Sequence, residues 1–453
     1  MKWLHWLWIV LIPATALAVV LLLIAPEERT VWTTDSPEAL EEFELCLEAL
    51  RKIYVPEASR HCAAALEHDP DFLMPKLERA RFLRMEGKEA ASDELFTELR
   101  EADLSKVTPR ERFLIRINLK QQEGQGDYAE EILDEYLREY PSDPWAINIR
   151  CNQIWDEQEP EVAESCYERL LKADPNWVDA QNRLGYLAMA RGRFEQAEEH
   201  FETYEYLAPD QANPHDSMGE LLILIGRYED AEKELQRALE IRPDFCASYD
   251  HLVRLYLMQD DFDRAREALA ARKAEPACEQ HRPPVHLIEC AIDASELGER
   301  ELWEEVWELV EGRCSDVLGE LALVGHEAAL RTGRREEALA LEEKHRQAVA
   351  EASERPAQQR VISAMLAHME GTRLMIEGKP AEAAKRFEET DRLIPYWQAS
   401  GLSALKLKNQ LDLAASLATA GQIEKAHQVL DRVRSVNPRV IEHYEGPDLG
   451  PMG

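Results

Sequence analysis

A small residue returns every 34 positions along the middle of this 453-residue chain. Alanine keeps that interval at five positions, and proline keeps it at four, each twelve positions after an alanine. The residues are Ala129, Ala163, Ala197, Ala231 and Ala265, followed by Pro141, Pro175, Pro209 and Pro243. Such a strict period, with a small residue inside it and proline at its end, is typical of stacked helical hairpins. Because no run of alternating β-branched residues indicates a sheet, the sequence predicts an all-α solenoid.

When each repeat is numbered so that its proline is position 32, small residues occupy two other positions, 20 and 8. Position 20 holds Ala58, Ser92, Ala129, Ala163, Ala197, Ala231, Ala265, Ala338, Ala383 and Ala426. Position 8 holds Cys46, Ala80, Cys151, Gly185, Gly219, Gly371 and Ala414. We expect positions 8 and 20 to face each other where the two helices of a hairpin come closest, because bulk there would push them apart. The proline lacks an N–H group and ends the second helix.

Two neighbouring repeats are the clearest. The first reads Leu184-Gly185…Gly192-Arg193-Phe194…Ala197…Phe201…Pro209, and the next reads Met218-Gly219…Gly226-Arg227-Tyr228…Ala231…Leu235…Ala238…Pro243. These repeats resemble the tetratricopeptide repeat (TPR) family, and the resemblance covers about residues 38–440. It implies an α-α superhelix of about ten or eleven hairpins. It also implies a protein-binding surface, without indicating which partner is bound.

The register breaks in several places, and these breaks suggest a division of the chain. Ala129 follows Ser92 by 37 residues, and no clean repeat occurs over 277–316. The segments are a transmembrane anchor over 1–25, a juxtamembrane linker over 26–37, an N-terminal TPR array over 38–350, a hinge over 351–363, C-terminal TPR hairpins over 364–440 and a tail over 441–453.

The amino terminus reads as a membrane anchor. Trp3 to Ile24 is a run of 22 residues without a formal charge, which is long enough to span a hydrocarbon core of about 30 Å. A cleaved signal peptide is the alternative, but the most apolar stretch follows the small residues Ala16 and Ala18. With Lys2 on the amino-terminal flank, the positive-inside rule predicts a single-pass protein of the bacterial inner membrane with a periplasmic soluble domain.

The charge balance excludes some partners. The chain has 88 Asp and Glu against 53 Lys and Arg, a formal net charge of −35. Nucleic acid and anionic lipid both need a basic face, so neither is expected to bind the array. The acidic residues either keep the outer helix faces soluble or attract a basic partner, and the sequence leaves both interpretations open.

Two pairs of the eight cysteines fall at suggestive positions. Cys46 and Cys62 are positions 8 and 24 of one repeat, and Cys151 and Cys166 are positions 8 and 23 of another. Each pair places one cysteine on each helix of a hairpin, near the close approach, where a disulfide fits. Disulfides would imply an oxidising compartment. The alternative is that each cysteine is a small buried packing residue.

A metal site and a cofactor are not expected. The quartet Cys278, His281, His286 and Cys290 has the spacing C-x2-H-x4-H-x3-C, which fits no zinc-finger pattern, and two prolines lie inside it. No phosphate loop, nucleophile elbow, HExxH motif or kinase motif occurs, and the repeats leave no room for a catalytic domain. We therefore expect a protein that is not an enzyme and has no small-molecule substrate.

The TPR resemblance also implies where a ligand would lie. In TPR arrays, positions 2, 5, 9 and 12 of the first helix line the concave face, and three successive repeats here place asparagine at position 5 or 9. A row of carboxamides can pair with the backbone of an extended peptide, although asparagine is also simply tolerated on an exposed helix. The groove candidates are Asn118, Asn148, Asn152, Asn182, Arg183, Asp250 and Arg254.

These observations lead to one functional hypothesis and one alternative. The hypothesis is a non-catalytic, membrane-tethered TPR scaffold that binds a protein or peptide, through an extended segment in its concave groove, for envelope assembly. The alternative is a sensor-like ectodomain that regulates a separate signalling partner. It is suggested by Trp32 to Leu40, a segment similar to the join between transmembrane helix and TPRs in bacterial signalling proteins.

Overall fold

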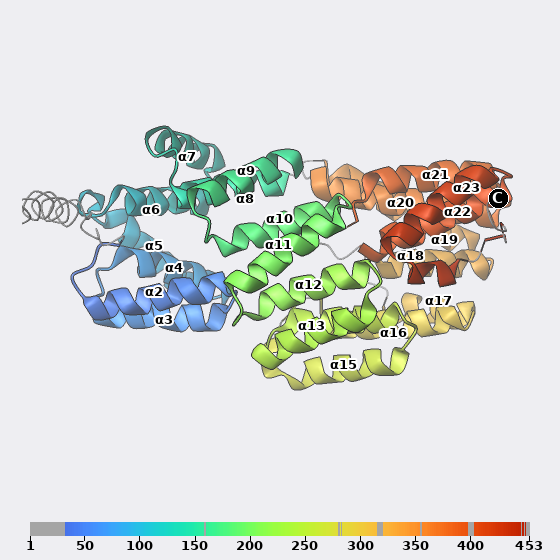
Figure 1. Ribbon diagram of the computed structural model, residues 1–453, viewed down its shortest axis with the longest axis horizontal. Helices are drawn as coiled ribbons and strands as arrows, with labels where there is room; N and C mark the ends of the chain where they lie inside the picture. Colours follow the sequence, from blue (N-terminus) through green and yellow to red (C-terminus); the bar gives the residue numbers. More distant parts are fainter. Residues whose placement is uncertain are drawn as a thin grey trace, which may run out of the picture. The chain divides into compact units, whose positions relative to one another are not determined.

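The computed structural model describes residues 32–157, 160–279, 281, 283–314, 320–353, 356–396, 403–444, 446–447 and 449. Within these residues it contains 22 α-helices and three short 3-10 helices, and no strand. Consecutive α-helices pair as antiparallel hairpins (Figure 1). The prediction of an all-α array of TPR-like hairpins is confirmed in this part of the chain.

The chain forms two compact units, residues 1–141 and 142–453, and each is described by itself. The helices of the first unit are α2 (Pro37–Arg51), α3 (Val55–His68), α4 (Leu73–Met85), α5 (Glu89–Glu101), η1 (Leu104–Lys106), α6 (Pro109–Gln122) and α7 (Gly126–Glu139). Trp32 is buried edge-on against Phe43, and Thr33 donates to the carboxylate of Glu111. The end of the segment expected to be a linker, 26–37, is therefore packed onto the first unit.

The second unit contains eight hairpins. Its helices are α8 (Pro144–Glu157), α9 (Pro160–Ala173), α10 (Val178–Ala190), α11 (Phe194–Leu207), α12 (Ala212–Leu224), α13 (Tyr228–Ile241), α14 (Cys246–Leu257), α15 (Phe262–Ala274), η2 (Pro276–Cys278), α16 (Val285–Glu299), α17 (Trp303–Glu311), α18 (Glu320–Arg331), α19 (Arg335–Glu351), α20 (Pro356–Ile376), α21 (Pro380–Leu393), α22 (Ser403–Thr419), α23 (Ile423–Val436) and η3 (Arg439–His443).

Local sequence explains where the helices begin and end. The Thr108 hydroxyl and the Glu111 carboxylate form a capping box at the start of α6. The first helix of a hairpin ends at a residue with positive φ, a conformation that glycine adopts without strain. Gly192 and Gly226 fill this place in two hairpins, and Asp260 takes the same conformation in the next.

The close approach inside each hairpin explains the small residues of the repeat. Ser92 at position 20 is fully buried and donates from its hydroxyl to the carbonyl of Ala80 at position 8, 2.8 Å away. The glycine at position 8 lies under the side chain at position 24, since a Cβ atom on Gly185 would lie 2.4 Å from the ring of Phe201. The expectation that positions 8 and 20 meet is confirmed in the α4–α5 hairpin by the bond from Ser92 to Ala80.

Two segments in which the repeat register breaks are largely helical in the structure. The region 277–316, expected to be irregular, contains the hairpin of α16 and α17, in which Val306 and Trp307 are buried. The segment 351–363, expected to be a hinge, is helical from Pro356 onward and belongs to the long helix α20. The Pro at position 356 suits a helix start because its missing N–H needs no partner there.

The C-terminal hairpins pack back against the middle of the second unit. One hydrophobic cluster combines residues of α10 to α16 with residues of α20 to α23 and η3 (Figure 1). Three successive hairpin turns are contacted. Tyr396 donates its backbone N–H to Ala190 and stacks edge-on against Phe194, and His443 lies 3.7 Å from Asp260.

The third contact is the most buried. The carboxamide of Asn437, fully buried, donates to the carbonyl of Leu224 at 3.1 Å and to the hydroxyl of Tyr228 at 3.2 Å. Together these contacts close the solenoid on itself within the second unit. In consequence α12 is buried along all 13 of its residues, unlike a helix in an open array.

No helix among the described residues is long and apolar enough to span a bilayer. The anchor predicted over 1–25 and the first part of the linker predicted over 26–37 lie outside the described residues. The tail predicted over 441–453 begins inside η3, and several of its remaining residues also lie outside the described part.

Candidate functional site

The predicted groove residues of the second unit lie on α8, α10 and α14, the first helices of three hairpins. On α8, Asn148, Asn152 and Trp155 follow at intervals of four and three residues and therefore share one face. Asn152 accepts a hydrogen bond from the Tyr167 hydroxyl at 2.8 Å. The guanidinium of Arg183, from α10, lies over the Trp155 ring with its carbon 4.9 Å from the ring centroid.

Asn148 differs from its neighbours. Its Oδ1 atom is buried and has no hydrogen-bond partner among the residues that the structure describes. A buried acceptor without a donor is unfavourable by about 1–3 kcal/mol. The helix α8 therefore holds a buried acceptor without a partner among the described residues, on the same face as Asn152 and Trp155.

Asn182 is used inside the array. Its side chain is only 7 % exposed, and its Oδ1 accepts from the hydroxyl of Ser217 at 3.0 Å. The oxygen of that serine also accepts a hydrogen bond from the hydroxyl of Tyr186, whose pKa is raised well above its usual range by burial and by nearby carboxylates. The asparagine thus connects α10 to α12.

A buried cluster of charged side chains connects α12 to α14. Asp216 accepts from the Ser248 hydroxyl at 2.7 Å and pairs with His251 at 3.0 Å. Glu220 accepts from Arg254, one of the predicted groove residues, at 2.7 Å. Burial alone would lower the pKa of His251, but the two carboxylates outweigh burial and raise it.

Asp250, also predicted to line the groove, pairs with Arg272, whose side chain is completely buried, at 3.0 Å. Arg272 donates further to the carbonyls of His281 and Pro283. Burial raises the pKa of Asp250 to about 6, partly offset by the guanidinium. This ion pair holds the loop after α15 against α14 rather than lining an open surface.

Asn118 belongs to the first unit. Its side-chain amide donates to the carbonyl of Leu114, one turn earlier in α6, at 2.8 Å. The structure thus engages Asn118, Asn182, Asp250 and Arg254 in bonds within the protein. In the α8 part of the predicted row, Asn148 keeps a buried acceptor without a hydrogen-bond partner among the described residues, and Oδ1 of Asp250 has only its ion pair with Arg272.

Every cysteine lies in a disulfide in the structure. Cys46 pairs with Cys62 and Cys151 with Cys166, with Cα atoms 5.3 and 5.4 Å apart, as the repeat positions suggested. Two further pairs were not predicted from the sequence. They are Cys246–Cys278 and Cys290–Cys314.

The cysteines of the possible zinc quartet are therefore separated into different disulfides. Cys278 is bonded to Cys246 and Cys290 to Cys314, so the two sulfurs are not available as thiolate ligands. Cys278, Cys290 and Cys314 lie in the region 277–316, where the 34-residue register is broken, so the repeat gave no signal for these pairings.

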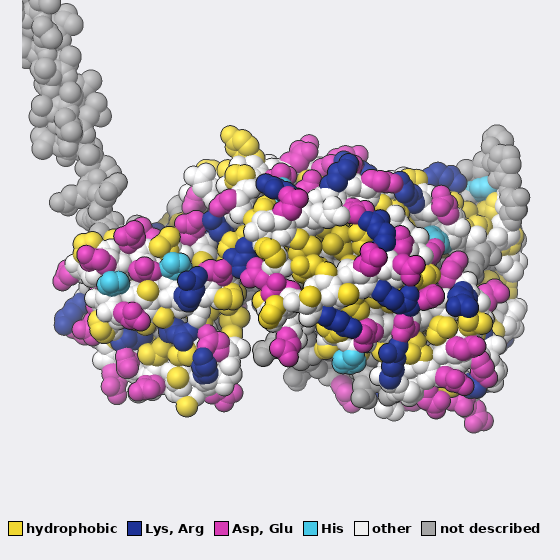
Figure 2. Space-filling view, turned by 90° about the horizontal axis from the view of Figure 1, so that it is seen from below, with side chains coloured by type: hydrophobic (Ala, Val, Ile, Leu, Met, Phe, Trp, Pro, Cys, Tyr) yellow, Lys and Arg dark blue, Asp and Glu magenta, His cyan; other side chains and the backbone are white. Residues whose placement is uncertain are grey.

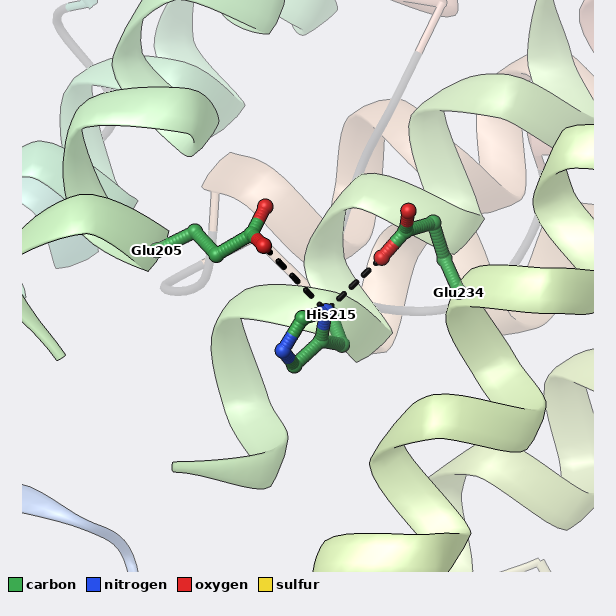
Figure 3. A group of neighbouring side chains, drawn as sticks. All are labelled: Glu205, His215 and Glu234. Atoms are coloured by element: carbon green, nitrogen blue, oxygen red, sulfur yellow. Dashed lines mark hydrogen bonds and ion pairs between the residues drawn. The ribbon is translucent and has the colours of Figure 1, made fainter. Parts of the chain in front are cut away.

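One group of side chains has the composition of a metal site. Glu205 of α11, His215 of α12 and Glu234 of α13 point toward one another in Figure 3, and one ligand atom of each lies within 4.8 Å of the others. His215 Nδ1 is 2.7 Å from the Glu234 carboxylate and 3.9 Å from that of Glu205. Sequence analysis missed this group, although His215 and Glu234 occupy the same repeat positions, 4 and 23, as Glu42 and His61.

The surface does not gather its negative charge in one place on the side seen in Figure 2. There the Asp and Glu side chains are interspersed with Lys and Arg, and many form ion pairs, such as Glu164 with Arg193 and Glu198 with Arg227. Such a mixed surface favours the interpretation that the acidic residues keep the helices soluble.

Comparison with known proteins identifies the repeats. Two family models, both described as tetratricopeptide repeat, match residues 155–212 and residues 215–245. No curated protein matches the chain. The matched residues include α10, α11 and α13 and all of α12 except residues 213 and 214.

Several solved structures are similar to the chain at low identity. A tetratricopeptide repeat protein from Parabacteroides merdae has 14 % identity, with 59 % of this chain and 98 % of that chain covered, at a TM-score of 0.39. Yeast Tom70 has 13 % identity, with 90 % and 88 % covered, at a TM-score of 0.36. From the family models and the hairpin geometry, the chain contains tetratricopeptide repeats.

Proposed function

We propose that this protein is a non-catalytic scaffold, tethered to the bacterial inner membrane by its N-terminal segment, that binds an extended segment of a partner protein during envelope assembly. The TPR repeats themselves suggest a protein-interaction scaffold. The tether, the compartment and the extended ligand are further parts of the proposal, and each has its own support.

The observation that carries the proposed binding mode is the unpartnered Oδ1 atom of Asn148 on α8. A backbone N–H from an extended peptide is a suitable donor for it. Asn152 lies one turn further along the same face, and Arg183 stacked on Trp155 adds a flat surface that combines charge with apolar area. Backbone pairing of this kind binds a segment with little demand on its side chains.

The four disulfides support the proposed location of the array outside the cytoplasm. All eight cysteines are paired in the structure, and disulfides persist in oxidising compartments such as the periplasm. This agrees with the orientation that Lys2 favours for the N-terminal segment.

The binding mode is tested with Asn148→Ala in the full-length protein. Because Oδ1 of Asn148 has no hydrogen-bond partner among the described residues, the substitution breaks no hydrogen bond there and should not lower the urea midpoint. A partner recovered from envelope extracts with the wild-type protein, then purified, should bind the variant about tenfold more weakly, the loss expected for one hydrogen bond in a dry interface. Binding is measured by calorimetric titration.

The matched control is Gln236→Ala on the second helix α13. Gln236 is exposed and bonds only to Glu232 of its own helix, so its removal should change neither stability nor binding. Equal affinity of the wild type and of Asn148→Ala for the purified partner would rule out this face as the binding surface.

The compartment is tested by trapping thiols in acid-quenched cells. The cysteines are at most 9 % exposed, so alkylation must be done in denaturant. We expect no alkylated cysteine before reduction and eight after it. Free thiols before reduction would contradict the oxidised, extracytoplasmic array. Protease digestion of the array in spheroplasts, but not of a cytoplasmic marker, completes the test.

A further inference from the structure

The side chains of Glu205, His215 and Glu234 are best understood against a contact that recurs in other hairpins. Repeat positions 4 and 23 form a polar pair between the two helices of a hairpin. The pairs are Glu42 with His61 at 2.7 Å, Gln181 with His200 at 2.8 Å and His215 with Glu234 at 2.7 Å. Two side chains thus connect the helices in each of these three hairpins, and no third group is needed for that.

The α12–α13 hairpin alone adds a third ligand. Glu205 comes from α11, in the preceding hairpin, and brings a carboxylate oxygen 3.9 Å from Nδ1 of His215. Among the described residues, this is the one group of three His, Cys, Asp or Glu side chains whose ligand atoms all lie within 4.8 Å of one another. The pairs around His61 and His200 gain no such partner.

The charge in this group is uncompensated. Glu205 and Glu234 face one imidazole, and the ion pairs of both carboxylates are with His215, not with Lys or Arg. Other carboxylates between neighbouring hairpins have an arginine, as Glu164 has Arg193 and Glu220 has Arg254. Two carboxylates brought together beside a buried imidazole therefore favour a cation between them.

We propose that Glu205, His215 and Glu234 bind one zinc ion. A nitrogen ligand with two carboxylate oxygens suits Zn²⁺, while Ca²⁺ and Mg²⁺ prefer oxygen alone. Ligand atoms around a tetrahedral zinc lie roughly 3.3 Å apart, given bonds of about 2.0–2.1 Å. Nδ1 of His215 lies 2.7 Å from the Glu234 carboxylate and 3.9 Å from the Glu205 carboxylate, one on either side of that value. A small rotation of the two glutamate side chains brings both distances to it.

The burial of the three residues gives the site an entrance and an open position. His215 is 7 % exposed, whereas the side chains of Glu205 and Glu234 are 41 % and 30 % exposed. The ion enters on the carboxylate side, and water fills the fourth coordination position. The zinc would join α11 to α12 and α13 and so fix one hairpin against the next.

The test uses the untagged, oxidised full-length protein after treatment with a chelator. Since no cysteine is free in the structure, thiols do not compete for the metal. Titration with Zn²⁺ should give one site per chain and raise the thermal midpoint. Glu205→Gln keeps the His215–Glu234 pair but removes one ligand, and should weaken zinc binding at least about tenfold.

The control is Glu202→Gln, which lies on α11 about one turn earlier and is exposed. It has the same change of charge and should bind zinc as the wild type does. Equal zinc affinity of the wild type and Glu205→Gln would overturn the proposal, as would the absence of a one-to-one site in the wild type. A tetrahedral absorption spectrum of the Co²⁺ complex, lost in Glu205→Gln, would support it independently.

Discussion

The side-chain amide of Asn437 lies 3.4 Å from the backbone carbonyl oxygen of Ile223, a residue 214 positions earlier in the chain. In a regular solenoid each repeat contacts only its neighbours. Here the last hairpin contacts a turn in the middle of the second unit, and the contact is completely buried. The second unit is therefore stabilised by a long-range contact in addition to the repeat-to-repeat packing.

The first prediction concerns this contact. Asn437→Ala should lower the free energy of unfolding by about 2–3 kcal/mol, because the carbonyl of Leu224 and other buried groups lose their partner. Urea unfolding of the full-length protein measures the change. Ser435→Ala is the control, since that serine is exposed and bonds to its own helix, and it should change stability by less than about 0.5 kcal/mol. Equal effects of the two variants would contradict the role of the contact.

The second prediction concerns the close approach of two helices. Gly185→Ala should destabilise the protein by about 1–3 kcal/mol, because the new Cβ would lie 2.4 Å from the Phe201 ring. Gly298→Ala, also in a helix of the second unit, has its nearest neighbour at 3.9 Å. That control should be neutral or stabilising by up to about 1 kcal/mol through higher helix propensity. Thermal and urea unfolding both report the difference.

The third prediction concerns a disulfide. Cys151 and Cys166 are separated by 15 residues, and closing a loop of that length is worth about 3 kcal/mol in the chain-entropy account. Cys151→Ala/Cys166→Ala should therefore lower the free energy of unfolding by roughly that amount under oxidising conditions. In strong reductant the free energy of unfolding of the wild type should fall to that of the variant. An advantage that survives full reduction would show that packing, not the bond, is responsible.

The fourth prediction concerns pH. The pKa of Asp250 in the folded protein is raised to about 6, whereas an unfolded aspartate titrates near about 3.9. Between these values the folded state binds the proton more tightly, so the contribution of Asp250 to stability falls as pH rises from about 4 to about 6. Arg272 remains beside the group throughout.

Asp250→Asn removes this titration and provides the measurement. The stability of the wild type relative to the variant should fall by about 1–3 kcal/mol between pH 4 and pH 6.5, the size expected for a shift of roughly two pKa units in a mostly buried group. Urea unfolding at several pH values gives the curve. A constant difference between wild type and variant across this range would mean that Asp250 does not titrate there.

Sequence alone was sufficient for the fold of the repeats, because their packing is local. The small residue at position 8 and the larger one at position 24 meet in the same hairpin, as Gly185 and Phe201 do. Cys46 and Cys62 occupy the same two positions with a disulfide. The period read along the chain therefore includes this contact. It also suggested Cys46–Cys62 and Cys151–Cys166, which are two of the four disulfides in the structure.

The remaining features depend on contacts that the period does not contain. The contact of Asn437 with Ile223 depends on the curvature that many hairpins accumulate, which no single repeat specifies. We predicted the groove residues from their positions on the first helix of each repeat alone. The hydrogen-bond partners of Asn182 and Arg254 inside the protein were therefore not predicted. The recurrence of a histidine at position 4 or 23 was visible in the sequence, and it would have indicated the His215–Glu234 pair.

The closure of the second unit also has a consequence during synthesis. Asn437 is made 214 residues after Ile223, which takes roughly 10–40 s at translation rates of about 5–20 residues per second. For that interval the turn between α12 and α13 is exposed on the nascent chain, with its backbone carbonyls still hydrated. A chain released before residue 437 would keep that edge uncovered, so premature termination should yield a protein that adheres to others rather than a shorter functional array.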